Sequence, residues 1–211
     1  MKKEIDIKNW TRREQSEFFK GDDEPRFSIT STLDVTNLYR YVKENRLSFY
    51  YSLIYLSMIS INSIDEFHYK LEGNKVFYYD SLQPSFCDLR KGETNYFIVD
   101  VRMDLNETIK TFDTKCTEKS FNQKTFLDEG EFEQNELVYV SCLPWIDVTS
   151  IVEERKFDKN DSIPHVCWGK YVEKNGRLIL HYSIMVNHRL MDGYHVGLFF
   201  NRLQESIKKL Q

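Results

Sequence analysis

Apolar and polar residues alternate along the chain between positions 177 and 187. Apolar side chains stand at every second position there, namely at Leu178, Leu180, Tyr182, Ile184 and Val186. A period of two predicts a half-buried strand, and this strand ends just before His188. Asp192-Gly193 then has turn chemistry, and apolar residues beyond it fall at helical spacing, at Val196, Phe199, Phe200, Leu203, Ile207 and Leu210. We therefore expect the order strand, His188, tight turn, helix.

Similar patterns predict the other elements of the chain. Helical spacing and long apolar runs predict helices at 10–19, 34–45, 49–64 and 106–119, with Asp34 and Asn106 as N-caps. Alternation predicts strands at 27–31, 67–71, 76–79, 95–103 and 138–143. Asn175-Gly176 is the strongest hairpin signal, and it separates 168–174 from 177–186. Without an internal repeat or a linker-like segment, these elements indicate one mixed α/β domain over residues 1–211.

Composition narrows the class of protein. Charged residues make up 29% and hydrophobic residues 41%, which is typical of a soluble globular protein. The formal net charge of −4 argues against general nucleic-acid binding, since a phosphate backbone is bound by a basic surface. No apolar run reaches the roughly 18 residues of a membrane span, and residues 1–6 lack the apolar region of a secretion signal. We expect a cytoplasmic protein that binds neither nucleic acid nor membranes.

His188 is the leading candidate for chemistry. Its position at the end of a strand, before a turn, allows one ring nitrogen to face a cleft, and an imidazole exchanges its proton near neutral pH. These properties suit a general base. The alternative is a histidine that only bonds a neighbouring carbonyl.

A metal site is a third possibility for the same region. His188, Asp192 and His195 stand at i, i+4 and i+7, which would place them on one face of a continuous helix. Gly193 and the strand pattern before His188 argue against such a helix. The four cysteines are widely spaced and form no C-x-x-C pair. We therefore expect no metal.

The motif His-x-x-x-Asp-Gly, from His188 to Gly193, resembles the signature of CoA-dependent acyltransferases that include the chloramphenicol acetyltransferases. Segments at 10–14, 80–84, 141–145, 192–196 and 201–205 resemble the chloramphenicol acetyltransferase family in order and spacing. The resemblance implies a mixed sheet covered by helices in two layers, assembled as a homotrimer with active sites between subunits. It also implies O-acetylation of chloramphenicol by acetyl-CoA, and with it antibiotic resistance.

The resemblance implies roles for particular residues. His188 matches the general base and Ser141 the oxyanion donor, while Asp192 and Arg12 match a pair that shapes the histidine loop. Without the resemblance, Ser141 reads as a turn former and Arg12 as part of a solvated helix face.

Substrate contacts are implied in the same way. Phe19, Phe27 and Phe97 match aromatic pocket positions, Ile151 and Cys167 belong to the acceptor side, and Lys170 matches a lysine near the CoA phosphate. An exposed surface lysine is the alternative for Lys170.

The chain departs from the family mainly on the acceptor side. Glu153 stands where an apolar residue would touch chloramphenicol, Cys167 replaces a threonine, Asn187 a histidine, and Ser48 a lysine that helps to bind CoA. The sequence therefore leaves the identity of the acceptor open between chloramphenicol and another small hydroxyl or amine compound. A third hypothesis is a non-catalytic trimeric binding protein, which would have no acceptor.

Overall fold

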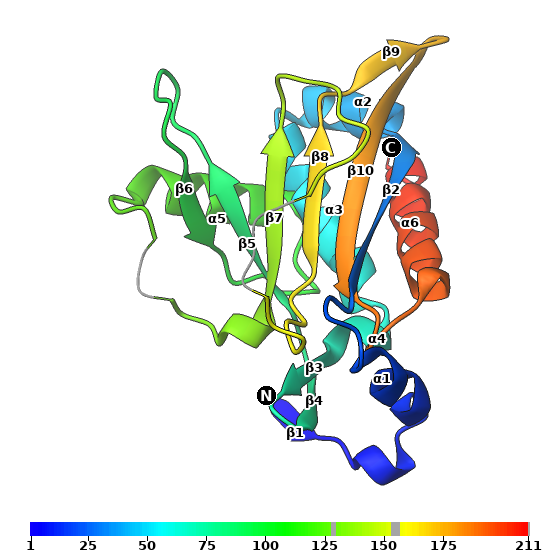
Figure 1. The fold of residues 1–211 in the computed structure, drawn as a ribbon. Helices are drawn as coiled ribbons and strands as arrows, with labels where there is room; N and C mark the ends of the chain where they lie inside the picture. Colours follow the sequence, from blue (N-terminus) through cyan, green and yellow to red (C-terminus); the bar gives the residue numbers. More distant parts are fainter. Residues whose placement is uncertain (128–129, 153–156, 211) are drawn as a thin grey trace.

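Seven strands form the main sheet of the computed structural model, which describes residues 1–127, 130–152 and 157–210 (Figure 1). Glu153 lies outside the described residues. In spatial order the strands are β2 (Arg26–Asp34), β10 (Arg177–Asn187), β8 (His165–Gly169), β7 (Leu137–Leu143), β5 (Gln83–Asp88) and β6 (Phe97–Asp100), and β9 (Val172–Lys174) pairs with β10. β7 runs parallel to β5 and to β8, and the other pairs are antiparallel. The expected mixed sheet is confirmed.

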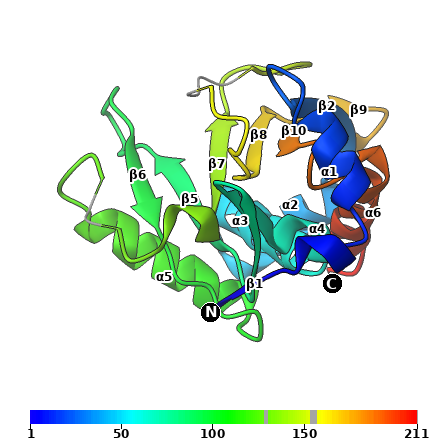
Figure 2. The same ribbon diagram turned by 60° about the horizontal axis from the view of Figure 1, so that its bottom comes forward.

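Four helices cover one face of this sheet. They are α2 (Thr36–Asn45), α3 (Phe49–Asn62), α5 (Ile109–Asn122) and α6 (Gly193–Lys208). Figure 2 shows them on the same side of the strands. The apolar run of α3 is explained by its position, since α3 contacts α2, α5 and α6 as well as the sheet. The opposite face carries none of the helices drawn in Figure 1.

A smaller, three-stranded sheet lies at the end of the main sheet where β2 begins and β10 ends (Figure 1). Its strands are β1 (Lys2–Glu4), β4 (Lys75–Tyr79) and β3 (Tyr69–Glu72). The helices α1 (Arg13–Phe19) and α4 (Asp65–His68) lie at this end, and two 3-10 turns span Ile7–Asn9 and Gln134–Glu136. The expected hairpin of β3 and β4 is confirmed, and its turn contains Gly73 at φ 61°.

The strongest hairpin signal is also confirmed. Asn175 and Gly176 have φ angles of 54° and 75° between β9 and β10. Two successive positive φ values define the tight two-residue turn that Asn-Gly favours. This turn suits a hairpin because the twist of the turn matches the twist of the two strands.

Both expected N-caps are wrong by one or two residues. Val35 is the N-cap of α2, although the Asp34 carboxylate still accepts a hydrogen bond from the Thr36 backbone N–H at 3.0 Å. Thr108 caps α5 and accepts from the Thr111 N–H at 3.2 Å. Threonine is also a favoured N-cap, although asparagine, which stands two residues earlier, is favoured more strongly.

Candidate active site

His188 emerges where the main sheet ends. The ladder between β2 and β10 closes with the pair Arg26 and Asn187, and the His188 backbone N–H then donates to the Pro25 carbonyl at 2.8 Å. The long β2–β10 ladder therefore fixes the backbone up to His188.

The imidazole of His188 lies between two aromatic rings. Phe19 of α1 stacks on it at 3.9 Å between ring centroids with 12° between the planes, and Phe27 of β2 lies at 4.5 Å. The side chain is 32% exposed, while its Nδ1 is buried. The exposed edge is therefore the Nε2 side, and the two rings leave the imidazole little freedom to rotate.

Arg12 forms hydrogen bonds with His188 and with the loop that follows it. Its Nη1 lies 2.7 Å from Asp192 Oδ2, and its Nη2 lies 2.6 Å from Asp192 Oδ1 and 2.8 Å from the His188 carbonyl. Hydrogen bonding to Arg12 lowers the pKa of Asp192, so that this carboxyl stays ionised. Asp192 Oδ1 is also 3.2 Å from His188 Nδ1, although the angle is poor for a hydrogen bond.

His195 turns away from His188. Its Nδ1 accepts a hydrogen bond from the Asp192 backbone N–H at 3.0 Å, and its Nε2 lies 3.3 Å from Glu66 Oε1. Asp192 is the N-cap of α6 with φ −119°, so these residues do not share one continuous helix. Among the described residues, no group of three or more His, Cys, Asp and Glu side chains could hold a metal ion.

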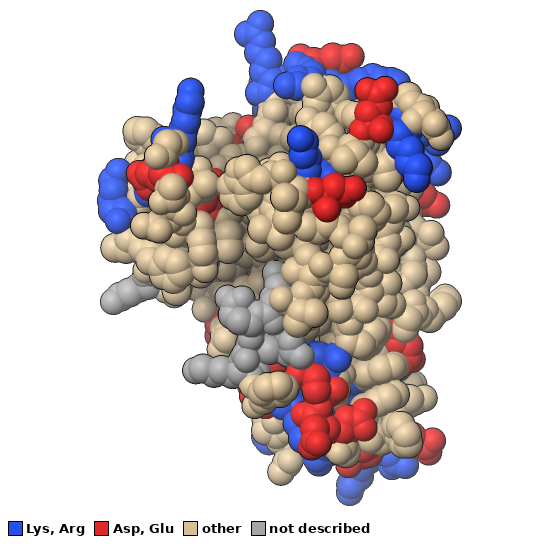
Figure 3. All heavy atoms as spheres, turned by 45° about the horizontal axis from the view of Figure 1, so that its top comes forward, with Lys and Arg blue, Asp and Glu red and all other residues tan. Residues whose placement is uncertain are grey.

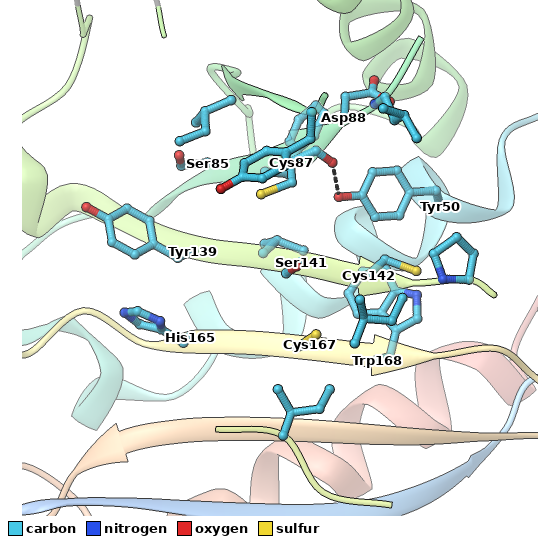
Figure 4. A pocket seen from close by; sticks show the side chains of 18 of the residues that line it. Tyr50, Ser85, Cys87, Asp88, Tyr139, Ser141, Cys142, His165, Cys167 and Trp168 are labelled. Carbon is cyan, nitrogen blue, oxygen red and sulfur yellow. Dashed lines mark hydrogen bonds between the residues drawn. The ribbon is translucent and has the colours of Figure 1, made fainter. Parts of the chain in front are cut away.

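A second functional region is a groove of about 1490 Å³ on the helix-free face of the sheet. Strand pleating places Tyr139, Ser141 and Leu143 of β7 on the groove side, whereas Val138 packs in the core, and Val140 belongs to the core but also borders the groove. Figure 4 shows Ser141 in the middle of the groove, with Cys87 and Cys167 on the neighbouring strands. Charged side chains are sparse over the middle of the face in Figure 3 and gather toward its upper and lower margins.

The groove contains three of the six residues expected to bind the substrates, namely Ile151, Cys167 and Lys170. Ser141 and Ser48 line it as well. Lys170 is exposed, just beyond the end of β8, and its backbone N–H donates to the Ile146 carbonyl at 2.7 Å. An exposed lysine at the edge of the groove is suited to bind a phosphate group.

Phe97 lies elsewhere, which corrects its expected position. Its ring is 3% exposed in the core, and the Arg90 guanidinium lies 4.2 Å from its centroid. Because side chains alternate along β6, Ile98 and Asp100 line the groove instead. Of the three phenylalanines, only Phe19 and Phe27 contact the candidate base.

Ser141 and His188 lie far apart within one chain. Ser141 pairs with Cys167 of β8, and Cys167 pairs with Ser183 of β10. His188 follows Ser183 by five residues, which corresponds to roughly 17 Å along the strands and about 10 Å across them. The candidate base and the candidate oxyanion donor therefore cannot act together on one substrate inside a single chain.

Two of the three thiols that line the groove, Cys142 and Cys167, are poor candidates for a nucleophile. Burial raises the pKa of the Cys142 thiol to about 12, and Cys167 is only 3% exposed. Because the thiolate is the nucleophilic form, an acyl intermediate on Cys142 or Cys167 is disfavoured.

Sequence reasoning missed several polar residues of the groove, namely Ser85, Asp100, Tyr139 and His165. A partial signal existed for Tyr139, since it stands two residues before Ser141 in a predicted strand and so shares its face. Asp100 also lies in a predicted strand, at 95–103, but the alternation did not show which face it takes, and Ser85 and His165 lie outside the predicted strands.

Solved structures define the class of this fold. A chloramphenicol acetyltransferase superposes with a TM-score of 0.87 over 98% of this chain and 100% of its own, at 24% identity. A probable dihydrolipoamide acetyltransferase from Listeria monocytogenes superposes with a TM-score of 0.66 over 99% of this chain and 95% of its own, at 15% identity. The fold is that of the CoA-dependent acyltransferases.

Sequence comparison then gives the family. The model of the family "Chloramphenicol acetyltransferase" matches residues 2–204. Chloramphenicol acetyltransferase 3 of Escherichia coli is 30% identical over 204 residues, which cover 95% of this chain and 94% of that protein. The enzyme of Clostridium perfringens is 28% identical over 204 residues, covering 95% and 92%. The chain belongs to the chloramphenicol acetyltransferase family and is thereby an acyltransferase.

None of the helices described is long and apolar enough to cross a bilayer.

Proposed function

We propose that this protein transfers the acetyl group of acetyl-CoA to a hydroxyl of chloramphenicol, with His188 as the general base. The observation that carries this proposal is the state of the His188 ring: its Nδ1 is buried, two aromatic rings hold it, and its Nε2 edge is exposed. Family membership supports the reaction, because the curated relatives bear the name of this activity.

The proposed reaction has two proton transfers and no covalent enzyme intermediate. His188 Nε2 takes the proton of the acceptor hydroxyl while that oxygen attacks the thioester carbonyl of acetyl-CoA. The resulting oxyanion accepts a hydrogen bond from the Ser141 hydroxyl. When the tetrahedral intermediate collapses, the C–S bond breaks and the CoA sulfur receives the proton from His188. The products are the acetyl ester and CoA with a free thiol.

We propose a homotrimer in which His188 of one subunit faces the Ser141 groove of the next. The separation of the two residues within one chain supports this arrangement, as do the exposed edge of His188 and the open groove. In a cyclic trimer each subunit presents its His188 to one neighbour and its Ser141 groove to the other. Every interface between subunits therefore contains one complete site.

The remaining assignments belong to the same proposal. Lys170 binds a phosphate of CoA, Arg12 and Asp192 position the His188 loop, and Phe19, Phe27, Ile151 and Cys167 contact the acceptor. The chain acts as one domain of residues 1–211 in the cytoplasm, where acetylation of the drug gives resistance.

The test is the release of thiol from acetyl-CoA with chloramphenicol as acceptor. We expect chloramphenicol-dependent release that falls about 10²- to 10⁴-fold in His188→Ala. His181→Ala is the matched control, since His181 lies on β10, seven residues before His188, and its Nδ1 lies 2.7 Å from Asp147 Oδ1, outside the groove. Equal rates in the wild type and in His188→Ala would overturn the role of His188 and favour a non-catalytic binding protein.

A further inference from the structure

The two residues on either side of His188 have buried polar side chains that bond to the same segment of the chain. Asn187 is 2% exposed and Arg189 is 5% exposed. Both side chains reach the segment 158–162, which leads into β8 and lies beside the end of β10 (Figure 1). Neither residue lines the groove, and burial keeps both from contact with a substrate. Any effect that they have on the reaction must therefore pass through His188.

The side-chain amide of Asn187 uses both of its ends. Its Nδ2 donates to the carbonyls of Lys159 at 3.1 Å and of Asp161 at 2.8 Å, and its Oδ1 accepts from the Arg189 backbone N–H at 3.0 Å. A primary amide suits this place because it offers two N–H donors and an acceptor on one planar group. Asn187 thereby ties the backbone before and after His188 to the neighbouring segment.

The guanidinium of Arg189 joins the same segment to α1. Its Nη1 donates to Asn160 Oδ1 at 2.7 Å, and its Nε donates to the Ser16 carbonyl at 3.3 Å. Ser16 stands three positions before Phe19 on α1, and the Phe19 ring stacks on the imidazole. Arg189 therefore holds the stacking partner of His188 as well as the chain that follows His188.

The 158–162 segment is anchored from two further strands. Arg26 of β2 forms an ion pair with Asp161 and donates to the Ile163 carbonyl at 3.2 Å. Ser162 Oγ accepts a hydrogen bond from a backbone N–H of β3 at 2.8 Å. A buried polar group that loses its partner is costly, so a network with this many shared partners resists rearrangement. The segment thus offers fixed acceptors to the two residues beside the candidate base.

We propose that Asn187 and Arg189 are positioning residues, which hold the His188 imidazole against Phe19 and aim its Nε2 at the substrate. The inference rests on the proposed function, because it concerns how the general base of that reaction is held. A base must lie within hydrogen-bond reach of the proton that it takes. A displacement of about 1 Å can lower a rate by roughly 10²-fold. The aromatic rings limit rotation of the imidazole, and Asn187 and Arg189 limit movement of the backbone that carries it.

The first test observes the His188 ring in the absence of substrate. In protein labelled with 13C in its histidines, the NMR signal of His188 is identified by its loss in His188→Ala. The stacked Phe19 ring should move the ring protons of His188 to lower ppm, because protons above an aromatic face are shielded. We expect Asn187→Ala to return the signal toward the range of unstacked histidines. Arg189→Lys keeps the charge and loses the planar fork, and should move the signal in the same direction.

The second test asks whether Asn187 acts through His188. Asn187→Ala should lower kcat for thiol release by about 10- to 100-fold and change KM for acetyl-CoA by less than about twofold, since Asn187 lies outside the groove. In the His188→Ala background, the same replacement should lower the residual rate by less than about twofold, because the group that it positions is gone. A residue that only stabilises the fold would lower the rate by the same factor in both backgrounds.

Asn62→Ala is the matched control. Asn62 is the last residue of α3, and its side chain also makes three hydrogen bonds. It donates to the carbonyls of Met58 at 2.9 Å and Leu82 at 3.1 Å, and it accepts from the Leu82 N–H at 2.8 Å. Its replacement should lower the stability of the fold, while kcat and the NMR signal of His188 stay as in the wild type.

The outcomes separate this inference from the proposed function. An unchanged His188 signal in folded Asn187→Ala and Arg189→Lys proteins overturns the inference, even if the wild type acetylates chloramphenicol readily. An equal fall in rate with and without the imidazole does the same. If Asn187→Ala does not fold, Arg189→Lys decides by the same two measurements. If no acceptor causes thiol release, the proposed function fails, and the NMR signal still shows whether the two residues hold the ring.

Discussion

Arg12 and Asp192 form a two-pronged ion pair, with Nη1 to Oδ2 at 2.7 Å and Nη2 to Oδ1 at 2.6 Å. The pair joins the start of α1 to the loop after β10, and Arg12 is 9% exposed. Since Arg12 also binds the His188 carbonyl, it links the N-terminal segment to the candidate base. Phe19, which stacks on the imidazole, belongs to the same helix.

Replacing Arg12 by lysine should therefore reduce both stability and activity. Lysine keeps the charge and loses the planar fork, so at most one of the two carboxylate contacts survives. We expect the free energy of unfolding to fall by about 1–3 kcal/mol, together with a lower kcat, measured by denaturant titration and thiol release. Arg13→Lys is the control, because Arg13 is exposed in the next position and should change neither quantity.

A buried lysine predicts an unusual dependence of stability on pH. Lys70 of β3 is fully buried, with its Nζ donating to the Ser162 carbonyl at 3.1 Å and with Asp161 and Arg26 nearby. Burial lowers its pKa from 10.5 to about 7. Between these values the unfolded chain binds a proton that the folded chain lacks, so stability rises with pH across this window and is independent of this group below it.

Lys70→Met should flatten that rise, because methionine fills a similar volume without a titrating group. The slope of unfolding free energy against pH is expected to decrease by at most about 1.4 kcal/mol per unit between roughly pH 7 and 10. Lys75→Met, on the exposed side of the neighbouring strand β4, should leave the slope unchanged. An identical slope in Lys70→Met and the wild type would show that Lys70 keeps its proton in the folded protein across this range of pH.

Ser141→Ala tests the oxyanion donor. We expect kcat to fall about 10²- to 10³-fold with little change in stability, since Ser141 is half-buried in the groove. Ser183→Ala is the matched control, because Ser183 pairs across the sheet with Cys167, which in turn pairs with Ser141. Ser183 is 4% exposed and shares a 2.7 Å hydrogen bond with Thr30, so its loss should cost about 1 kcal/mol of stability while the rate is kept. Ser141→Ala should thus lower the rate and not the stability, and Ser183→Ala should lower the stability and not the rate.

Gly169 should tolerate no side chain. A Cβ there would lie 2.7 Å from the Ile146 carbonyl oxygen and 2.8 Å from the Val148 backbone nitrogen, both on the loop that borders the groove. Gly169→Ala should cost about 1–3 kcal/mol in thermal or chemical unfolding. Gly197→Ala in α6, with nothing within 4 Å of the new Cβ, should instead stabilise by about 0.5–1 kcal/mol. Equal stabilities of the two variants would contradict the packing described for Gly169.

Sequence analysis was most accurate for the elements whose pattern of apolar residues corresponds to the faces that are buried in the fold. β10 has one face on the helices and the other on the groove side, so its alternation was visible, and α3 is apolar throughout because helices and sheet surround it. β5 was missed because Gln83-Pro84-Ser85 resembles a loop, although pairing with β6 and β7 makes it a strand. Proline is rare inside sheets, so local patterns argued against this strand.

The groove was harder to predict than the His188 region. His188, Arg12 and Asp192 stand in or near short motifs, whereas the polar side chains of the groove are brought together by the register of four strands that are distant in sequence. Phe97 shows the same difficulty, because a shift of one residue in a strand moves every side chain to the opposite face. Local patterns identify a strand and leave its register open.

Mixing two inactive variants tests most directly whether His188 acts on the Ser141 groove of another subunit. His188→Ala and Ser141→Ala should each be nearly inactive alone as homotrimers. Trimers formed by refolding equal amounts together should regain roughly a quarter of wild-type thiol release, because about one seam in four then joins an intact His188 to an intact Ser141. Activity of the mixture no higher than the average of the two separate variants would contradict the account.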